Sequence, residues 1–315
     1  MKYEFKSFLK KYFEDFIRFR EASNKTSVNF ERYLYYFDRH IQNNYPLCMK
    51  LTQEMADTWC KKRNSENESS CNSRCMPTIS FIKYLIDRDL TEIAIPKLPK
   101  VFKSNYIPHS FTKDELIRFF NKCDNLECRK NHSIDLIRKL EIPTIYRLLY
   151  STGIRTCEVL WLKRKDVNFE DSVISIEKSK GHNQRYVVLH DSMRTVLKNY
   201  DEAMNRLLPD RKILFPNDKD KIHSDRWLSD NFCKIWDEKS HARSYDFRHN
   251  YAIHNINKWI NEGFDFDDKL LYLSKSMGHK TVENTKYYYS IVPSLGSILE
   301  KQCEEGINEI LPKVY

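Results

Sequence analysis

Apolar side chains recur every three or four positions through the first ninety residues, and this spacing constrains that part of the chain to amphipathic helices. The pattern predicts four helices, over residues 3–20, 27–43, 52–64 and 73–88. The polar run 64–70 separates the last two. Because the aromatic residues keep the helical phase, we interpret them as core positions and not as platforms for stacking bases. We therefore expect a four-helix domain over residues 1–93.

The helical pattern stops at residues 94–109. This segment holds three of the ten prolines and shows little periodicity, which is typical of an extended stretch because proline donates no backbone hydrogen bond. Lys97 and Lys100 make it basic. We predict a linker here, followed by a second domain over residues 110–315.

The second domain is predicted to be mainly helical with one small antiparallel sheet. Thr112 and Glu115 have capping-box spacing, which indicates a helix start. Two alternating runs, residues 173–176 and 185–189, flank a turn-rich stretch and predict a β-hairpin. The other expected elements are an extended piece at 213–216 and helices at 133–151, 191–207, 224–239, 246–260, 267–276, 281–289 and 294–310.

The composition excludes several classes of protein. Only six glycines occur, and no glycine-rich phosphate loop is present, so neither a dinucleotide fold nor a P-loop is indicated. The nine cysteines show no zinc-site spacing, and we interpret them as reduced thiols. No run approaches the ~18 apolar residues of a membrane span, and the N-terminal residues lack an apolar signal region. We expect a cytoplasmic protein associated with the nucleoid.

The formal net charge of +9 fits a solvated basic surface as well as a surface that binds nucleic acid. Several basic residues on the polar helix faces and in the linker are expected to contact DNA phosphates, although each taken singly is more often solvated. These candidates are Lys10, Lys11, Arg18, Lys61, Lys62, Arg63, Arg74, Lys97 and Lys100.

Three groups in the last third of the chain could serve one phosphate. Arg248 is a cation for non-bridging oxygens, His279 is an imidazole donor, and Tyr288 is a phenol that can act as a nucleophile. Two groups that such a site still needs lie upstream. Arg155 is a second cation after a glycine turn, and Lys180 is a proton donor at the expected hairpin tip.

The order of these groups resembles the tyrosine recombinases, the phage-integrase and Xer-like family. The residues that carry the resemblance are Arg155 with Glu158 in the first arginine box, Lys180 in the hairpin, Tyr245-x-x-Arg248, and Gly278-His279 followed nine residues later by Tyr288. Five matches in order at compatible spacing are far more specific than one. The resemblance covers nearly the whole chain and implies a helical core-binding domain followed by a catalytic domain.

The resemblance implies a site-specific recombinase in which Tyr288 attacks a phosphodiester and forms a 3′-phosphotyrosine. Arg155 and Arg248 would stabilise the charge on phosphorus, and His279 would donate to a non-bridging oxygen. Lys180 would act as the general acid, and Glu158 would orient Arg155. Neither a cofactor nor a metal ion is implied.

The implied partner is double-stranded DNA, bound by a homo-tetramer across two duplexes that assembles from monomers or dimers. The tail at residues 294–310 would dock either into a neighbouring subunit or onto its own domain. We expect no arm-binding domain before residue 3, so a simple Xer-sized or transposon-encoded recombinase is favoured, and with it a mobile element. An accessory directionality protein is compatible with this assignment.

Two residues depart from the family pattern or are ambiguous. The family usually has histidine where this chain has Tyr245, which can donate a hydrogen bond but cannot exchange protons near neutral pH. His249 is expected to point elsewhere. Tyr287 and Tyr289 are also phenols, but the register to His279 selects Tyr288 as the nucleophile.

Two other functions remain open from the sequence. A type IB topoisomerase shares the tyrosine chemistry but rejoins the same strand as a monomer, so it would relax DNA without recombinant products. A DNA-binding relative without catalysis is favoured only by Tyr245.

Overall fold

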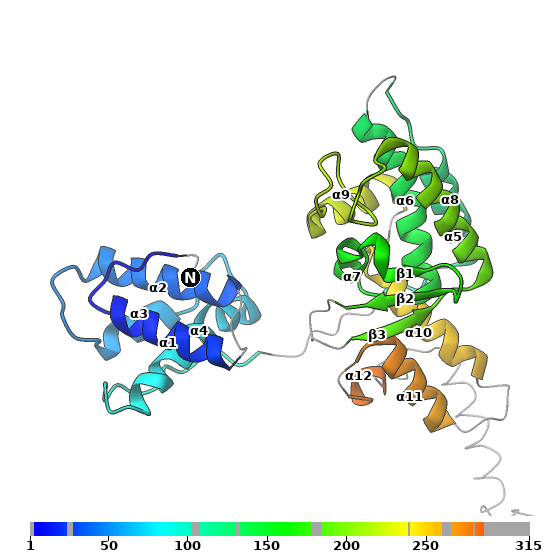
Figure 1. Cartoon of the computed structure of the whole chain (residues 1–315). Helices are drawn as coiled ribbons and strands as arrows, with labels where there is room; N and C mark the ends of the chain where they lie inside the picture. The colour runs from blue at the N-terminus through cyan, green and yellow to red at the C-terminus, as the bar shows by residue number, and fades with distance from the viewer. Residues whose placement is uncertain are drawn as a thin grey trace, which may run out of the picture. The chain divides into compact units, whose positions relative to one another are not determined.

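The computed structural model describes residues 3–23, 28–101, 108–129, 133–177, 184–238, 240–259, 266–279 and 281–286. The chain forms two compact units, Met1–Asn105 and Tyr106–Tyr315. Figure 1 shows helices in both units and a small antiparallel sheet in the second. The predicted class, mainly α with one small antiparallel sheet, is confirmed. The expected tail at residues 294–310 lies outside the described residues.

The first unit contains four helices: α1 (Lys10–Ala22), α2 (Val28–Asn44), α3 (Gln53–Cys60) and α4 (Glu68–Ile86). Their aromatic residues meet in the core, as their helical phase predicts. Phe13 stacks on Phe81 with 4.3 Å between ring centroids, and Phe37 packs edge-on against Phe13. All three rings are buried, so none of them presents a face to a base.

The first helix begins at Lys10 and not at residue 3, because a buried carboxylate takes the preceding amides. Asp38 on α2 accepts hydrogen bonds from Lys6 N at 2.8 Å and from Ser7 N at 3.0 Å. Amides bound in this way are held outside the helix that the apolar spacing predicted. A sequence pattern does not show this competition, because the partners lie 31 and 32 residues apart in the chain.

The fourth helix begins earlier than predicted, at Glu68 instead of residue 73. Asn67 acts as its N-cap, and its Oδ1 accepts a hydrogen bond from Ser70 N at 2.8 Å. The polar run 64–70 therefore holds the cap and first turn of α4.

Arg74 is part of the interior of the first unit, which corrects its assignment as a DNA contact. Its residue surface is 5% exposed. Its Nε donates to Glu66 Oε2 at 3.0 Å and its Nη2 to Lys61 O at 3.0 Å, with further bonds to Trp59 O and Glu66 Oε1. These carbonyls lie where α3 ends, at Cys60 instead of residue 64. Arg74 therefore joins the end of α3 to α4.

The first part of the expected linker is held by the first unit, so the boundary predicted at residue 93 is too early. Ala94 N donates to Gln53 Oε1 at 2.8 Å, and Gln53 Nε2 donates to Ala94 O at 3.2 Å. Asn72 Nδ2 donates to Pro99 O at 3.3 Å. The division between the two units follows Asn105.

The second unit is built around α6 (Ser133–Thr152), which contacts α5, α8 and α10. In Figure 1, α6 and α8 lie side by side. The other elements are α5 (Lys113–Asp124), α7 (Thr156–Trp161), η1 (Arg164–Asp166), α8 (Asp191–Leu207), α9 (Asp225–Ile235), α10 (Asp246–Trp259), α11 (Phe266–Met277) and α12 (Glu283–Lys286). The capping box before α5 is present, since Glu115 N donates to Thr112 Oγ1 and Thr112 N to Glu115 Oε2.

The sheet has the order β1 (Val167–Asn168), β2 (Val173–Ile176), β3 (Arg185–Val188), and all neighbours are antiparallel. The predicted hairpin pairs Ile174 with Val187, and both side chains are buried. Tyr186 and Val188 face the other side and are exposed. Arg185 is therefore in phase with the buried face of β3.

A small apolar cluster, separate from the main core, joins α10 to α11. It consists of Ala252, Ile253, Ile256, Leu273 and Met277. Polar contacts at the end of α11 add to the packing that this small cluster provides.

Replacing Arg74 with methionine should destabilise the first unit, because the largely buried carboxylate of Glu66 would remain without its cation. Breaking a buried ion pair from one side costs about 3–5 kcal/mol. Lys62→Met is the matched control, since Lys62 forms an exposed pair with Glu68 that is worth at most about 1 kcal/mol. Urea unfolding of the full chain measures both variants. Equal losses would contradict the structural role of Arg74.

Candidate active site

The turn that ends α11 places His279 directly after the helix. Gly278 has a φ of +66°. Its N–H donates to Lys275 O at 2.9 Å, and the N–H of His279 donates to Ser274 O at 3.0 Å. This pair of bonds defines a Schellman motif, which favours glycine because other residues are strained at positive φ. The Gly-His of the sequence is thus a helix stop.

Three arginines bind the last three carbonyls of this turn, and we call Arg155, Arg185 and Arg248 the arginine clamp. Arg185 Nε donates to Ser276 O, Arg248 Nη2 to Met277 O, and Arg155 Nη2 to Gly278 O, each at 2.7 Å. Carbonyls at a helix end lack partners within the helix and carry partial negative charge. Three guanidinium groups supply both the donors and the charge.

Glu158 on α7 links two members of the clamp. Its Oε1 accepts from Arg155 Nη1 at 2.7 Å and Arg185 Nη1 at 3.1 Å, and its Oε2 accepts from Arg185 Nη2 at 2.7 Å and Arg155 N at 3.0 Å. Burial raises the pKa of this carboxyl, but the hydrogen bonds and charges of Arg185 and Arg155 outweigh it, so the pKa is lowered. Glu158 therefore stays ionised and orients Arg155.

Arg248 lies near the start of α10 and is 1% exposed. Its Nη1 donates to Gly153 O at 2.6 Å. Gly153 also has a positive φ, +63°, and a Cβ there would lie 2.3 Å from Cδ1 of Tyr251. The glycine turn before Arg155 is therefore required both by the backbone and by the close approach of α10.

The imidazole of His279 is held neutral. Burial, followed by the charges of Arg248, Arg155, Arg185 and His249, lowers its pKa to about 4. Its Nδ1 lies 2.7 Å from Thr285 Oγ1 on α12. Assigning the threonine hydroxyl as the donor leaves the ring proton on Nε2. A neutral ring in this state can donate a hydrogen bond to an anion without carrying charge.

Tyr245 lies at the entrance of α10 with 39% of its surface exposed. The ring of His249 packs edge-on against it, with 5.1 Å between centroids. His249 is half-buried, and its charge acts on His279. The sequence placed His249 away from the site, whereas its ring lies against Tyr245 and its charge helps to lower the pKa of His279. Burial is the main cause that lowers the pKa of His249.

Of the predicted catalytic residues, Arg155, Arg248 and His279 meet at the end of α11. Glu158 is buried and binds Arg155. Lys180 and Tyr288 lie outside the described residues, as do Tyr287 and Tyr289. Arg185 was not predicted as a site residue. One feature of the sequence could have indicated its role. Arg185 is in phase with the buried face of β3, where an apolar residue is usual.

Neither a metal centre nor a membrane span is found in the part of the chain that the structure describes. No group of three or more His, Cys, Asp or Glu in the described ranges could hold a metal ion. In those same ranges no helix combines the length and apolar character that crossing a bilayer requires.

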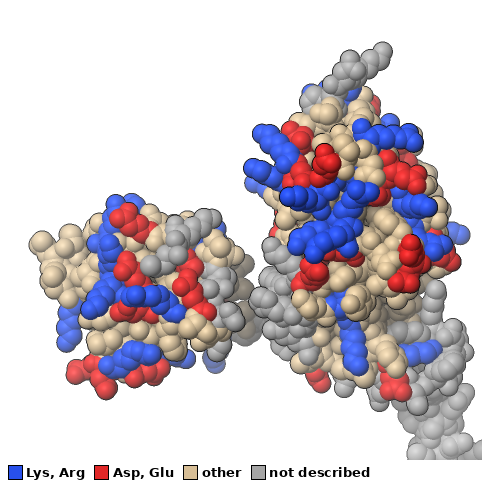
Figure 2. Space-filling model, viewed as in Figure 1, with Lys and Arg blue, Asp and Glu red and all other residues tan. Residues whose placement is uncertain are grey.

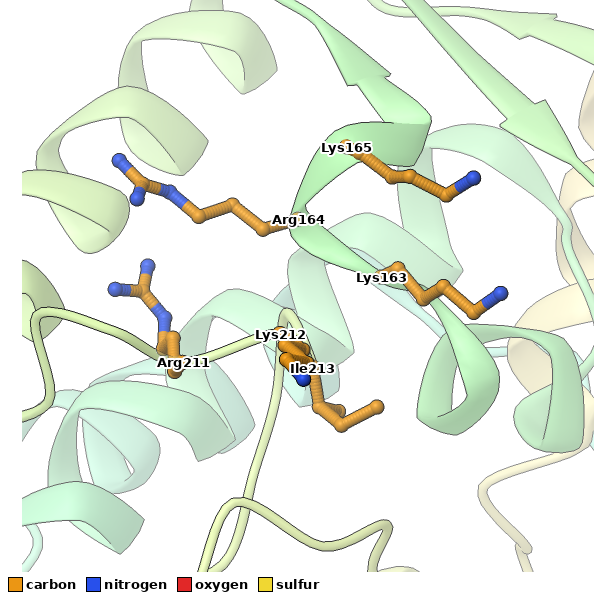
Figure 3. A pocket seen from close by; sticks show the side chains of 6 residues that line it. All are labelled: Lys163, Arg164, Lys165, Arg211, Lys212 and Ile213. Carbon is orange, nitrogen blue, oxygen red and sulfur yellow. The ribbon is translucent and has the colours of Figure 1, made fainter.

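A basic cavity of about 670 Å³ lies away from these residues, lined by Lys163, Arg164, Lys165, Arg211, Lys212 and Ile213 (Figure 3). The guanidinium groups of Arg164 and Arg211 point the same way, and both bind Asp201. Lys163 and Lys165 point the other way. Their Nζ atoms lie 4.0 and 3.9 Å from the carboxylate oxygens of Glu177. These ion pairs balance much of the positive charge of the cavity.

The remaining basic candidates of the first unit are exposed, unlike Arg74. They are Lys10, Lys11, Arg18, Lys61, Lys62, Arg63, Lys97 and Lys100. Lys61 and Lys97 line one groove between α3 and the extended segment that follows α4. Figure 2 shows Lys and Arg interspersed with Asp and Glu on the visible face of this unit. On the visible face of the second unit, Lys and Arg are likewise mixed with Asp and Glu.

Arg155, Arg248 and His279, two arginines and a neutral imidazole, meet at one largely buried turn of a mainly helical unit with a small sheet. Residues 109–293, more than half of the chain, match the model of the phage integrase family. The chain belongs to this family, and the class of enzyme predicted from the sequence, a tyrosine-type recombinase, is confirmed.

Individual relatives are distant. The chain is 22% identical to the tyrosine recombinase XerA of Pyrococcus horikoshii over 288 residues, covering 88% of each protein. It is 27% identical to a tyrosine recombinase of Thermosipho africanus over 191 residues, covering 59% of this chain and 58% of that protein. The Tn1549 transposon integrase in complex with a circular intermediate DNA aligns with a TM-score of 0.60 at 15% identity, over 90% of this chain and 94% of that one. This structural likeness shows a shared fold.

Gly278→Ala should displace the arginine clamp. An added Cβ would lie 2.7 Å from Nη1 of Arg185, and the left-handed backbone would cost about 1–2 kcal/mol in itself. We expect lower thermal stability and loss of cleavage. The matched control Lys275→Ala changes an exposed side chain one turn earlier and should leave both unchanged. A Gly278→Ala variant as stable as the wild type would contradict the crowding at this turn.

His279 should titrate with a pKa of about 4 in the DNA-free protein, against 6.5 for an ordinary histidine. Since the folded pKa is the lower one, the contribution of this residue to stability is complete above about pH 6.5 and is lost as the pH falls toward 4. Nuclear magnetic resonance of labelled histidine, assigned with His279→Gln, measures the value. A pKa at or above 6.5 would show that the arginines do not surround this ring.

Proposed function

We propose that this chain is a site-specific DNA recombinase that cleaves and rejoins DNA through a 3′-phosphotyrosine intermediate. The observation that carries this proposal is the convergence of Arg155, Arg248 and His279 at the end of α11. Tyr288 follows three residues after Thr285, which itself contacts His279. The nucleophile is thus close in sequence to a residue of the site.

The arginines would stabilise the charge that builds on phosphorus. Arg155 is anchored by Glu158 and the carbonyl of Gly278, while its side chain remains 19% exposed. A guanidinium fixed before the reaction stabilises a developing charge without reorganisation. A phenol with pKa about 10 is ionised in roughly one molecule per thousand at pH 7. The positive field of the clamp favours the phenolate of Tyr288.

The cleavage step forms one bond and breaks one. The phenolate oxygen of Tyr288 attacks phosphorus, the bond to the 5′-oxygen breaks, and Lys180 supplies the proton to that oxygen as general acid. Neutral His279 donates from Nε2 to a non-bridging oxygen. Tyr245 at the exposed entrance of α10 serves as a second donor and does not exchange protons.

Rejoining reverses the same chemistry with the 5′-hydroxyl of a partner strand. The covalent link conserves the energy of the phosphodiester bond, so no nucleotide is consumed. Exchange between two duplexes requires four protomers, and we propose a homo-tetramer on double-stranded DNA. The similarity to a transposon integrase supports a role in integrating or excising a mobile element.

The first unit would hold the duplex through its exposed lysines and arginines. Contacts of this kind fix the position of the protein on DNA and make its affinity fall with salt. Two of these lysines, Lys61 and Lys97, line one groove, which could accept a phosphate backbone. Arg74 takes no part, because its donors are bound within the unit.

A trapping experiment tests the proposal. Nicked duplexes made from DNA flanking the gene lose the 5′-hydroxyl fragment after cleavage and leave a covalent adduct, which a denaturing gel resolves. We expect an adduct with the wild type and with the matched control Tyr287→Phe, and none with Tyr288→Phe. An adduct that survives Tyr288→Phe would move the nucleophile to a neighbouring phenol. Binding without an adduct in the wild type would overturn the proposed chemistry.

A further inference from the structure

We infer that Arg185 is a positioning residue of the active site, which fixes the end of α11 and Glu158 to the base of the β-hairpin. This inference rests on the proposed function, since it names what holds Arg155 and His279 in place for the reaction. Arg185 is the one member of the arginine clamp that the family resemblance did not assign a role.

The hydrogen bonds of Arg185 point into the protein. Its Nε donates to Ser276 O at 2.7 Å, and its Nη1 and Nη2 donate to the two oxygens of Glu158 at 3.1 and 2.7 Å. Its side chain is 8% exposed, compared with 19% for Arg155. Arg185 is therefore bound on both edges of its guanidinium, and Arg155 is the member of this pair that can reach a phosphate.

Arg185 acts on Arg155 through a shared carboxylate. Glu158 Oε1 accepts from the guanidinium groups of both arginines, while Oε2 accepts from the Arg185 guanidinium and from the backbone N–H of Arg155. The carboxylate therefore couples the position of one guanidinium to that of the other. Glu158 is fully buried and lies between two cations. Without Arg185, the carboxylate would lose half of its donors and would be held by Arg155 alone, so the guanidinium of Arg155 would be less firmly fixed.

Arg185 also acts on His279 through the end of α11. It binds Ser276 O, and its guanidinium packs against Gly278 so closely that a Cβ would lie 2.7 Å from Nη1 and 2.9 Å from Cζ. His279 is the next residue. The Arg185 guanidinium therefore packs directly against the turn that precedes His279.

The place of Arg185 in the fold connects the hairpin to the same contacts. It is the first residue of β3, directly after the stretch that contains Lys180, and it pairs with Ile176 on β2. One side chain therefore ties the base of the hairpin to the helix end that leads toward Tyr288. Lysine cannot replace it, because an ammonium is a point charge and does not present the planar fork that binds both oxygens of a carboxylate.

The test compares Arg185→Lys and Arg185→Gln with the matched control Arg194→Lys, which alters an exposed ion pair on α8. Adduct formation on nicked duplexes is measured under single-turnover conditions, and DNA affinity is measured on native gels. We expect Arg185→Lys to lower the cleavage rate about 100-fold, the size of loss that a displacement of about 1 Å can cause. DNA affinity should be unchanged, and Arg194→Lys should match the wild type in both.

A second measurement separates this inference from the proposed function. The charged groups that act on His279 are Arg248 and His249 on α10, Arg155 before α7 and Arg185 on β3. Arg185→Gln removes one of these cations, so the pKa of His279 should rise above its wild-type value, whereas Arg185→Lys should raise it less. This titration needs no DNA. It therefore tests the contact even if the wild type forms no adduct, a result that would overturn the proposed function alone.

Three results would overturn the positioning role. The first is an Arg185→Lys variant that cleaves at the wild-type rate, because the planar fork would then be unnecessary. The second is a His279 pKa that does not move in Arg185→Gln, because Arg185 would then lie away from the ring. A parallel loss of DNA affinity and cleavage would also count against it, since it would make Arg185 a DNA contact.

Discussion

The site depends on one physical constraint, which is that the carbonyls at the end of α11 need donors. A helix ends with carbonyls that its own backbone cannot satisfy, and they lie at the negative end of the helix dipole. Here Ser276, Met277 and Gly278 each bind a different guanidinium. Because the apolar cluster between α10 and α11 is small, these three contacts fix the helix end to α10, to the start of α7 and to β3.

The same contacts give the site its charge. Arg155 and Arg185 share the buried carboxylate of Glu158, and the charges of all three arginines act on His279, so positive charge is in excess beside that ring. This excess keeps the imidazole of His279 neutral and favours an anion such as a phosphate. The structural role of the arginines and the catalytic role that we propose for them therefore follow from one arrangement, which requires glycine at both positive-φ turns, Gly153 and Gly278.

Local chemistry was predictable from the sequence, and contacts between distant residues were not. The capping box at Thr112 and the hairpin pairing of Ile174 with Val187 follow from residues close to their partners. The start of α1 did not follow, because Asp38 binds its amides from another helix. The burial of Arg74 and the role of Arg185 could not be predicted from the sequence for the same reason. Their partners are carboxylates and carbonyls that only folding brings together.

The most direct test of this account is a crystal structure of the full chain on a duplex that carries its cleavage site. We predict that Arg155 and His279 donate to non-bridging oxygens of one phosphate, while Arg185 remains bound to Glu158 and to the carbonyl of Ser276. A phosphate bound elsewhere would contradict the account. So would a complex in which Arg185 leaves Glu158 for the DNA, because the arginine clamp would then bind DNA and would not position the site.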